Sequence, residues 1–176
     1  MMHGTIAESI LISMRRLLTF AVLVMLVVPA SSAARPRGMA DGTLSVHDAR
    51  GIVAISARGG VIGSFARGSV TIDDPVDGDG TGPIVTGDDF PPIERSETKT
   101  TWRGTKVRFR IIGGRFTIRV QGRGINLSLV GRGNVLLNGA GTEDGIDDDG
   151  IYSVNGGEYT PIPDDPFSFP LSATSP

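Results

Sequence analysis

Nine lysines and arginines and no acidic residue lie between Thr98 and Thr142. Strict alternation would place five of them on one face of a β-hairpin: Lys106, Arg108, Arg110, Arg115 and Arg119. A face with this charge predicts a polyanionic partner, such as an anionic cell-wall polymer or an acidic glycan. Nucleic acid is disfavoured because the ribbon has no interleaved exposed aromatic side chains on which bases could stack.

The hairpin that would carry this ribbon is predicted over residues 106–121, with a two-residue turn at Gly113-Gly114. Counting outward from the turn pairs apolar residues with apolar ones on one face and polar with polar on the other. Arg108 would then face Arg119, a like-charge pair that costs stability unless an anion or a carboxylate lies between the two. Alternatively, acidic segments within residues 73–89 or 143–149 could fold over the ribbon and neutralise it.

An acidic stretch has the spacing of a calcium-binding loop. Asp77, Asp79 and Thr81 fall at positions 1, 3 and 5, and Asp88 falls at position 12. Two departures count against this interpretation, because Asp replaces the usual Glu at position 12 and prolines flank the loop in place of helices. The alternative is a solvated acidic linker. A second, less specific acidic cluster comprises Asp144, Asp147 and Asp149.

Catalytic motifs are absent from the sequence, which has no nucleophile elbow, zinc-binding helix or phosphate-cradling loop. His47 is the only histidine beyond the first three residues, and alternation places it on an outer face. Four glutamates could still converge as a glycosidase pair: Glu94, Glu97, Glu143 and Glu158. We expect a protein that is not an enzyme and has no cofactor other than a candidate Ca²⁺, with a glycan-active enzyme as the remaining alternative.

The N-terminal segment reads as a secretory signal peptide over residues 1–34, with translation starting at Met1 or at Met14. Two arginines precede an apolar run at residues 17–28, and small residues for a signal peptidase follow it. An uncleaved membrane anchor is the alternative, although the run is short for a membrane span. No second apolar run follows, so the sequence predicts a secreted protein of the extracellular space or cell envelope. The chain contains no cysteine, so no disulfide supports the exported domain.

Short alternating runs separated by glycine predict the fold class. A small-Arg-Gly tripeptide recurs with its arginine at positions 50, 58, 67, 123 and 132, which favours hairpin turns eight or nine residues apart. We therefore expect an all-β protein whose antiparallel meander closes into a small barrel or a two-sheet sandwich. A β-solenoid is the rival architecture. The likeness of residues 42–63 to residues 114–139 suggests an internal duplication.

The domain boundaries follow from these patterns. Residues 35–41 form a short linker, and residues 42–162 form one all-β domain that carries an acidic loop at 73–92. Late strands are expected near 150–154 and 158–162, joined by a turn at 155–157. The Pro- and Ser-rich tail at 163–176 either covers a sheet edge or is loose. Trp102, Phe109 and Phe116 are expected in the core.

The runs at residues 42–46, 111–116 and 122–131, together with the repeated Arg-Gly turns, resemble secreted β-rich proteins of high-GC actinobacteria. These motifs are structural, so the resemblance brings no activity with it. The leading hypothesis is a secreted, non-catalytic β domain with a structural or polyanion-binding role at the cell envelope. A calcium-stabilised extracellular β module is the alternative.

Overall fold

Eight antiparallel strands and no helix make up the part of the chain that the computed structural model describes, residues 40–76, 78–141 and 149–175. This confirms the predicted all-β class. The strands are β1 (Gly42–Asp73), β2 (Gly80–Asp88), β3 (Ile93–Glu94), β4 (Lys99–Gly113), β5 (Arg115–Gly139), β6 (Ile151–Val154), β7 (Thr160–Pro161) and β8 (Phe167–Leu171). None of these segments is a helix that could span a membrane. The predicted signal peptide lies outside the described residues.

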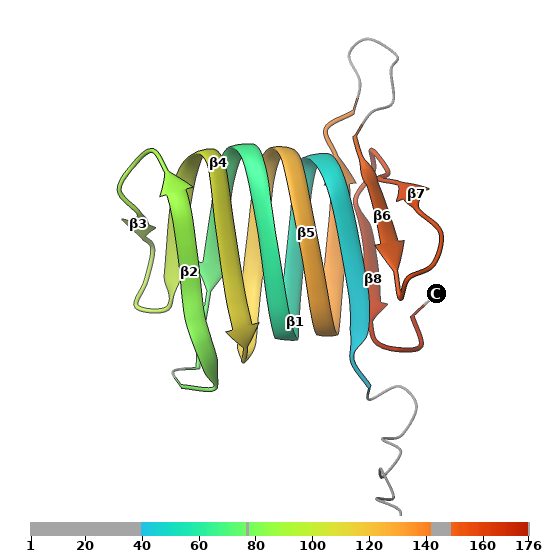
Figure 1. The fold of residues 1–176 in the computed structure, drawn as a ribbon, viewed down its shortest axis with the longest axis horizontal. Helices are drawn as coiled ribbons and strands as arrows, with labels where there is room; N and C mark the ends of the chain where they lie inside the picture. Colours follow the sequence, from blue (N-terminus) through green and yellow to red (C-terminus); the bar gives the residue numbers. More distant parts are fainter. Residues whose placement is uncertain (1–39, 77, 142–148, 176) are drawn as a thin grey trace, which may run out of the picture. The chain divides into compact units, whose positions relative to one another are not determined.

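β1 is a single bent strand of 32 residues that pairs with β5 along both of its flanks. Arg58 shows the arrangement, because its Cα partners are Arg115 on one flank and Arg132 on the other, seventeen positions further along β5. Gly51 repeats this pattern with Gly122 and Gly139. The strands therefore coil together with seventeen residues in each turn, as Figure 1 shows, and we call the coil formed by β1, β4 and β5 the winding.

The small-Arg-Gly tripeptides mark bends in continuous strands, which corrects the predicted hairpin turns. Val46, for example, has Leu127 and Tyr152 as Cα partners, and not the Val53 that a turn at Ala49-Arg50 would place there. Where a strand turns a corner, the neighbouring backbone approaches closely, and glycine leaves room for that approach. Glycine occurs both at bends within a strand and at hairpin turns, so the tripeptide alone does not distinguish a bend from a hairpin.

The predicted hairpin at Gly113-Gly114 is also wrong. Both glycines have positive φ, at 78° and 83°, as a tight turn requires. However, Ile111 before them pairs with Val61, and Phe116 after them pairs with Ala57, so β4 and β5 follow β1 one after the other. β4 and β5 pair with the long strand β1 instead of with each other, because β1 offers both of them a continuous antiparallel ladder.

The strand order β2-β4-β1-β5-β8 leaves β2 and β8 at the two edges of one sheet. The sheet is therefore not closed into a barrel, which corrects that prediction, and the two-sheet sandwich and the internal duplication are not confirmed. The core lies inside the winding, where the inward positions of β1, β4 and β5 are buried. Phe109 and Phe116 are among them, as predicted, and the partly buried Trp102 packs against the same cluster.

Three segments outside the winding extend the sheet. β2 lies within the predicted acidic loop and pairs with β4, so much of that segment is an edge strand and not a loop. Near the other end, β6 and β7 occupy the expected positions, with a turn at Asn155-Gly156 in which both residues have positive φ. β8 comes from the Pro- and Ser-rich tail and pairs with β5, which confirms that the tail covers an edge.

Candidate functional site

The predicted basic ribbon is split between two sides of the winding. Lys106, Arg108 and Arg110 are exposed along β4, and Arg115 follows directly after the bend at Gly113-Gly114. Arg119 lies on the next part of the winding, where its Cα partners are Ala54 and Thr71. The structure therefore brings together Arg108 and Arg110, the neighbours of the groove described below, and separates them from Arg119.

The expected like-charge pair between Arg108 and Arg119 does not form. The Cα partners of Arg108 are Ser64 on β1 and Thr86 on β2, which are both small hydroxyl residues. This correction follows directly from the loss of the hairpin, because the pairing of Arg108 with Arg119 required β4 and β5 to be neighbours.

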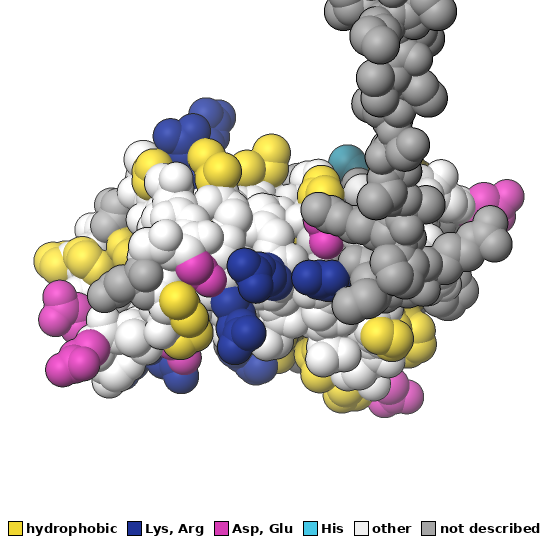
Figure 2. All heavy atoms as spheres, turned by 90° about the horizontal axis from the view of Figure 1, so that it is seen from below, with side chains coloured by type: hydrophobic (Ala, Val, Ile, Leu, Met, Phe, Trp, Pro, Cys, Tyr) yellow, Lys and Arg dark blue, Asp and Glu magenta, His cyan; other side chains and the backbone are white. Residues whose placement is uncertain are grey.

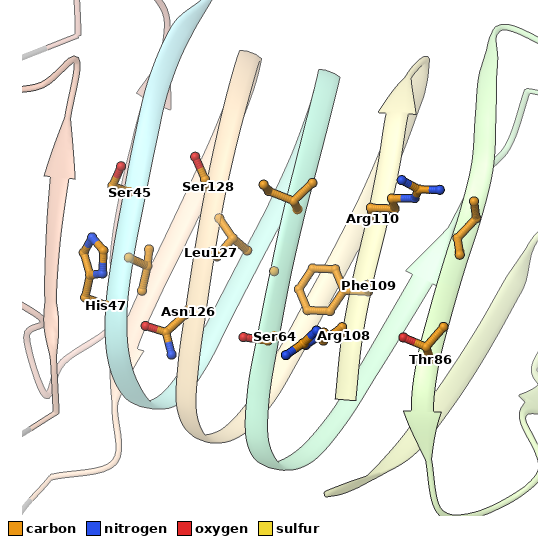
Figure 3. Close-up of a pocket in the computed structure, with 14 residues that line it drawn as sticks. Ser45, His47, Ser64, Thr86, Arg108, Phe109, Arg110, Asn126, Leu127 and Ser128 are labelled. Atoms are coloured by element: carbon orange, nitrogen blue, oxygen red, sulfur yellow. The ribbon is translucent and has the colours of Figure 1, made fainter. Parts of the chain in front are cut away.

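A shallow groove of about 680 Å³ crosses the outer face of the winding over β1, β5, β4 and β2. Figure 3 shows two rows of outward-facing side chains running across these strands, and the Cα partners within each row come from neighbouring strands. One row consists of Ser45, Ser128, Ile62, Arg110 and Ile84. The other consists of Asn126, Ser64, Arg108 and Thr86, with His47 at its end, where the register between β1 and β5 is shifted. We call these ten residues the polar groove.

The two arginines of the polar groove extend in different directions. In Figure 3, Arg108 reaches over β1 toward Ser64, whereas Arg110 reaches toward β2. Ile62, which is 59% exposed, and Ile84 are the Cα partners of Arg110 and give its surroundings apolar contact area. No carboxylate is among the described residues that line the groove. The positive charge of Arg108 and Arg110 is therefore available to a ligand.

His47 lies at one end of the polar groove and contacts Tyr159. Its Nε2 is 3.0 Å from the hydroxyl of Tyr159, and the two rings meet edge to face with centroids 5.2 Å apart. Asn126 is held nearby, since its Oδ1 accepts a hydrogen bond of 3.2 Å from the backbone N–H of Asp48. Alternation correctly predicts an outward His47. No local signal, however, pairs it with a residue 112 positions away.

The predicted calcium ligands lie along an edge strand and not around a common point. Thr81 and Asp88 lie near opposite ends of the nine-residue β2, and at ~3.3 Å per residue such a separation is about 23 Å. Asp79 Oδ2 instead accepts a hydrogen bond of 3.0 Å from the backbone N–H of Arg115. Asp77 lies outside the described residues. Within the described ranges, no group of three or more His, Asp or Glu side chains could hold a metal ion.

The glutamates proposed as a glycosidase pair are not brought together where the structure describes them. Glu94 belongs to β3 and Glu97 follows it, while Glu158 lies between β6 and β7. Figure 1 places β3 and the β6–β7 pair at opposite ends of the winding. Glu143 and the acidic residues Asp144 and Asp147 lie outside the described residues. Asp149 is buried, and its Oδ2 accepts a hydrogen bond from the backbone N–H of Gly141.

The fold and the polar groove define a coiled antiparallel β-sheet protein with an arginine-bearing groove on its outer face. No protein-family model, no curated protein and no solved structure matches this chain. The groove is therefore the feature from which function can be inferred, and the resemblance to secreted actinobacterial proteins stays a prediction.

Proposed function

We propose that this protein is a secreted, non-catalytic β module that binds an acidic glycan or an anionic cell-wall polymer at the cell envelope. The observation that carries the proposal is the position of Arg108 and Arg110 in the polar groove, two residues apart on β4. Arg108 lies between the hydroxyl residues Ser64 and Thr86, and Arg110 lies between Ile62 and Ile84. If the module has a structural role in the envelope, the same groove would attach it to the polymer.

The side chains of the polar groove match the chemistry of an acidic saccharide. Arginine binds a carboxylate, sulfate or phosphate through parallel N–H donors, which gives both strength and orientation. Hydroxyl and amide groups such as those of Ser64, Thr86 and Asn126 can donate hydrogen bonds to sugar hydroxyls and accept hydrogen bonds from them. The exposed side chain of Ile62 offers apolar contact to the C–H face of a sugar ring.

The absence of a neutralising partner supports an external anion. The guanidinium groups of Arg108 and Arg110 form no ion pair with any described residue, whereas Lys99 on the same strand does pair with Asp73 at 3.3 Å. A carboxylate-bearing polymer would therefore bind without displacing an internal partner of either arginine. Exposed contacts of this kind weaken as salt rises, because ions screen them.

A binding assay with a defined polymer tests this proposal. The purified protein is titrated with polygalacturonate, an acidic glycan, and with dextran, a neutral one, at low and at high salt. We expect binding to polygalacturonate only, with an affinity that falls as salt rises. Replacing both groove arginines (Arg108→Gln with Arg110→Gln) should weaken binding by about tenfold, since exposed contacts between opposite charges contribute up to ~1 kcal/mol each.

The matched control removes the same charge outside the groove. Arg103 and Arg119 are exposed on other parts of the winding and line no part of the polar groove. The pair of substitutions Arg103→Gln with Arg119→Gln should therefore change the affinity only a few-fold. Equal losses in the two double variants would show that net charge alone drives binding, and would contradict a role for the groove.

We also propose that the winding arose by internal duplication. Residues 42–63 and 114–139 resemble one another in sequence, and they are antiparallel partners along much of their length. The proposal predicts that related sequences keep glycine at matching bends in both segments. Relatives that keep the pattern in one segment only would contradict it.

A further inference from the structure

Each small-Arg-Gly bend carries an arginine, and the register of the winding brings these arginines together. Gly122 has Gly51 and Gly68 as Cα partners on its two flanks. The arginines next to these glycines therefore lie on three neighbouring passes of the chain. We call them the arginine column: Arg50, Arg67 and Arg123.

The arginine column surrounds a hollow of about 670 Å³. Arg67 and Arg123 are Cα partners across β1 and β5, and all three arginines are exposed. The remaining lining residues are neutral, and Gln121 is the polar side chain among them. None of the three guanidinium groups has an ion pair or a hydrogen bond to another described residue.

A similar group lies at the opposite edge of the winding, where Arg58 has both Arg115 and Arg132 as Cα partners. Figure 2 views this edge from below and shows basic side chains gathered near its centre. An acidic side chain is close to this second group, because Asp79 Oδ2 accepts a hydrogen bond from the backbone N–H of Arg115. No carboxylate is among the described residues that line the arginine column, although the buried carboxylate of Asp149 lies beside Gly139 and accepts a hydrogen bond from the backbone N–H of Gly141. The hollow at the column is the larger of the two, about 670 Å³ against about 310 Å³, so the column has more room for an anion.

The geometry of the bends explains their glycines but does not require arginine beside them. Any polar residue would keep a bend in contact with water. Like charges on directly opposite positions of neighbouring strands are destabilising, so Arg67 beside Arg123 lowers the stability of the free protein. A bound anion would reverse that cost, because it would lie between charges that otherwise repel one another.

We propose that the arginine column is a second binding site, whose ligand is a chain of closely spaced phosphoryl groups. Neighbouring strands lie ~4.8 Å apart, so three strands place the bases of the three side chains within about 10 Å. Guanidinium groups bind phosphate oxygens through two parallel hydrogen bonds, and several phosphoryl groups in a row can engage all three at once. The site lies apart from the polar groove and does not depend on the glycan-binding proposal.

Inorganic tripolyphosphate is the probe that tests the arginine column. Calorimetric titration of the protein at low salt should show binding of tripolyphosphate at least tenfold tighter than that of orthophosphate. The double substitution Arg67→Gln with Arg123→Gln should abolish this preference and should raise the melting temperature, because it removes the like-charge pair. Failure of the protein to bind tripolyphosphate, or equal affinity for the two anions, would overturn the proposal.

Two further variants separate this site from general charge and from the polar groove. Arg103→Gln with Arg119→Gln removes two exposed charges that do not line the hollow of the column, and should leave tripolyphosphate binding within about threefold of the original. Arg108→Gln with Arg110→Gln should leave it similarly unchanged while weakening polygalacturonate binding. If these variants lose tripolyphosphate affinity as strongly as the column variant, the column is not a specific site.

Co-sedimentation with cell envelopes distinguishes the possible sources of the phosphoryl chain. Retention that tripolyphosphate reverses, and that the column variant lacks, would locate the ligand on a phosphate-bearing envelope polymer. Tripolyphosphate binding without such retention would identify a free polyphosphate in solution. Retention that neither tripolyphosphate nor the column substitutions affect would contradict a role for the column in attachment to the envelope.

Discussion

Gly68 on β1 and Gly122 on β5 are Cα partners, and each leaves room for the backbone beside the other. A Cβ atom on Gly68 would lie 2.1 Å from the carbonyl oxygen of Gln121, and one on Gly122 would lie 2.2 Å from that of Arg67. Both residues also have φ near +155°, at 157° and 154°. The paired glycines therefore allow two strands to turn the same corner in contact.

The first prediction concerns this bend. Gly68→Ala should lower the free energy of unfolding by about 3 kcal/mol, since it combines an unfavourable φ with a backbone clash. Gly82→Ala is the control, because a Cβ on Gly82 meets nothing within 4 Å, and its effect should be small. Urea denaturation of the two variants measures the difference. Equal stability of the two would show that the bend tolerates a side chain.

The second prediction concerns packing inside the winding. The ring of Phe109 fills the space that a side chain on Gly63 would occupy, with its Cζ 2.4 Å from the position of the missing Cβ. Gly63→Ala should therefore destabilise the protein, and Phe109→Leu should cost less in that variant than in the original. A double-mutant cycle should show a coupling of about 1 kcal/mol. Additive effects would show that the ring moves aside without cost.

Calcium should have no effect on stability, which is the third prediction. β2 is an extended edge strand that carries Thr81 and Asp88 near its two ends, so these residues do not surround one ion. We expect the same melting temperature in calcium and in chelator. A rise with calcium that Asp79→Asn abolishes would instead support the calcium-stabilised module.

The fourth prediction concerns Tyr152, which packs against Phe167 and Phe169 with ring centroids 6.3 and 6.0 Å away. Burial raises the pKa of Tyr152 above its usual value of 10.0, because desolvation disfavours the phenolate. The unfolded chain therefore ionises first, and the stability that depends on neutral Tyr152 falls as pH rises above about 10. Chemical denaturation at pH 8 and pH 11 should show a smaller loss of stability for Tyr152→Phe. An identical loss would exclude this contribution.

Export is the fifth prediction. The N-terminal pattern predicts that a secreting host releases a product beginning at Arg35. Mass spectrometry of the culture supernatant measures that N-terminus, and substitution of Leu23 by Arg in the apolar run should retain the chain inside the cell. A product that keeps residues 1–34 in the membrane would favour the uncleaved anchor.

Along β1, β4 and β5, the sequence by itself determined that the chain is extended and which side chains face the core, whereas β2 lies in a segment predicted as a loop. Alternation identified Phe109 and Phe116 as inward residues, and both are buried. It also placed His47, Arg108 and Arg110 outward, and all three are exposed. This succeeds because the period of two is a local property of an extended chain and holds whatever the partner strand is.

Only the tertiary structure decided which strands are neighbours. Gly113-Gly114 can close a hairpin or turn a corner, and the 32-residue β1 selects the corner because it pairs with both β4 and β5. As a result, the neighbours of Arg108 are Ser64 and Thr86 and not the predicted Arg119. The same pairing places Arg67 opposite Arg123. Both the polar groove and the arginine column therefore depend on register between distant segments, which local periodicity does not contain.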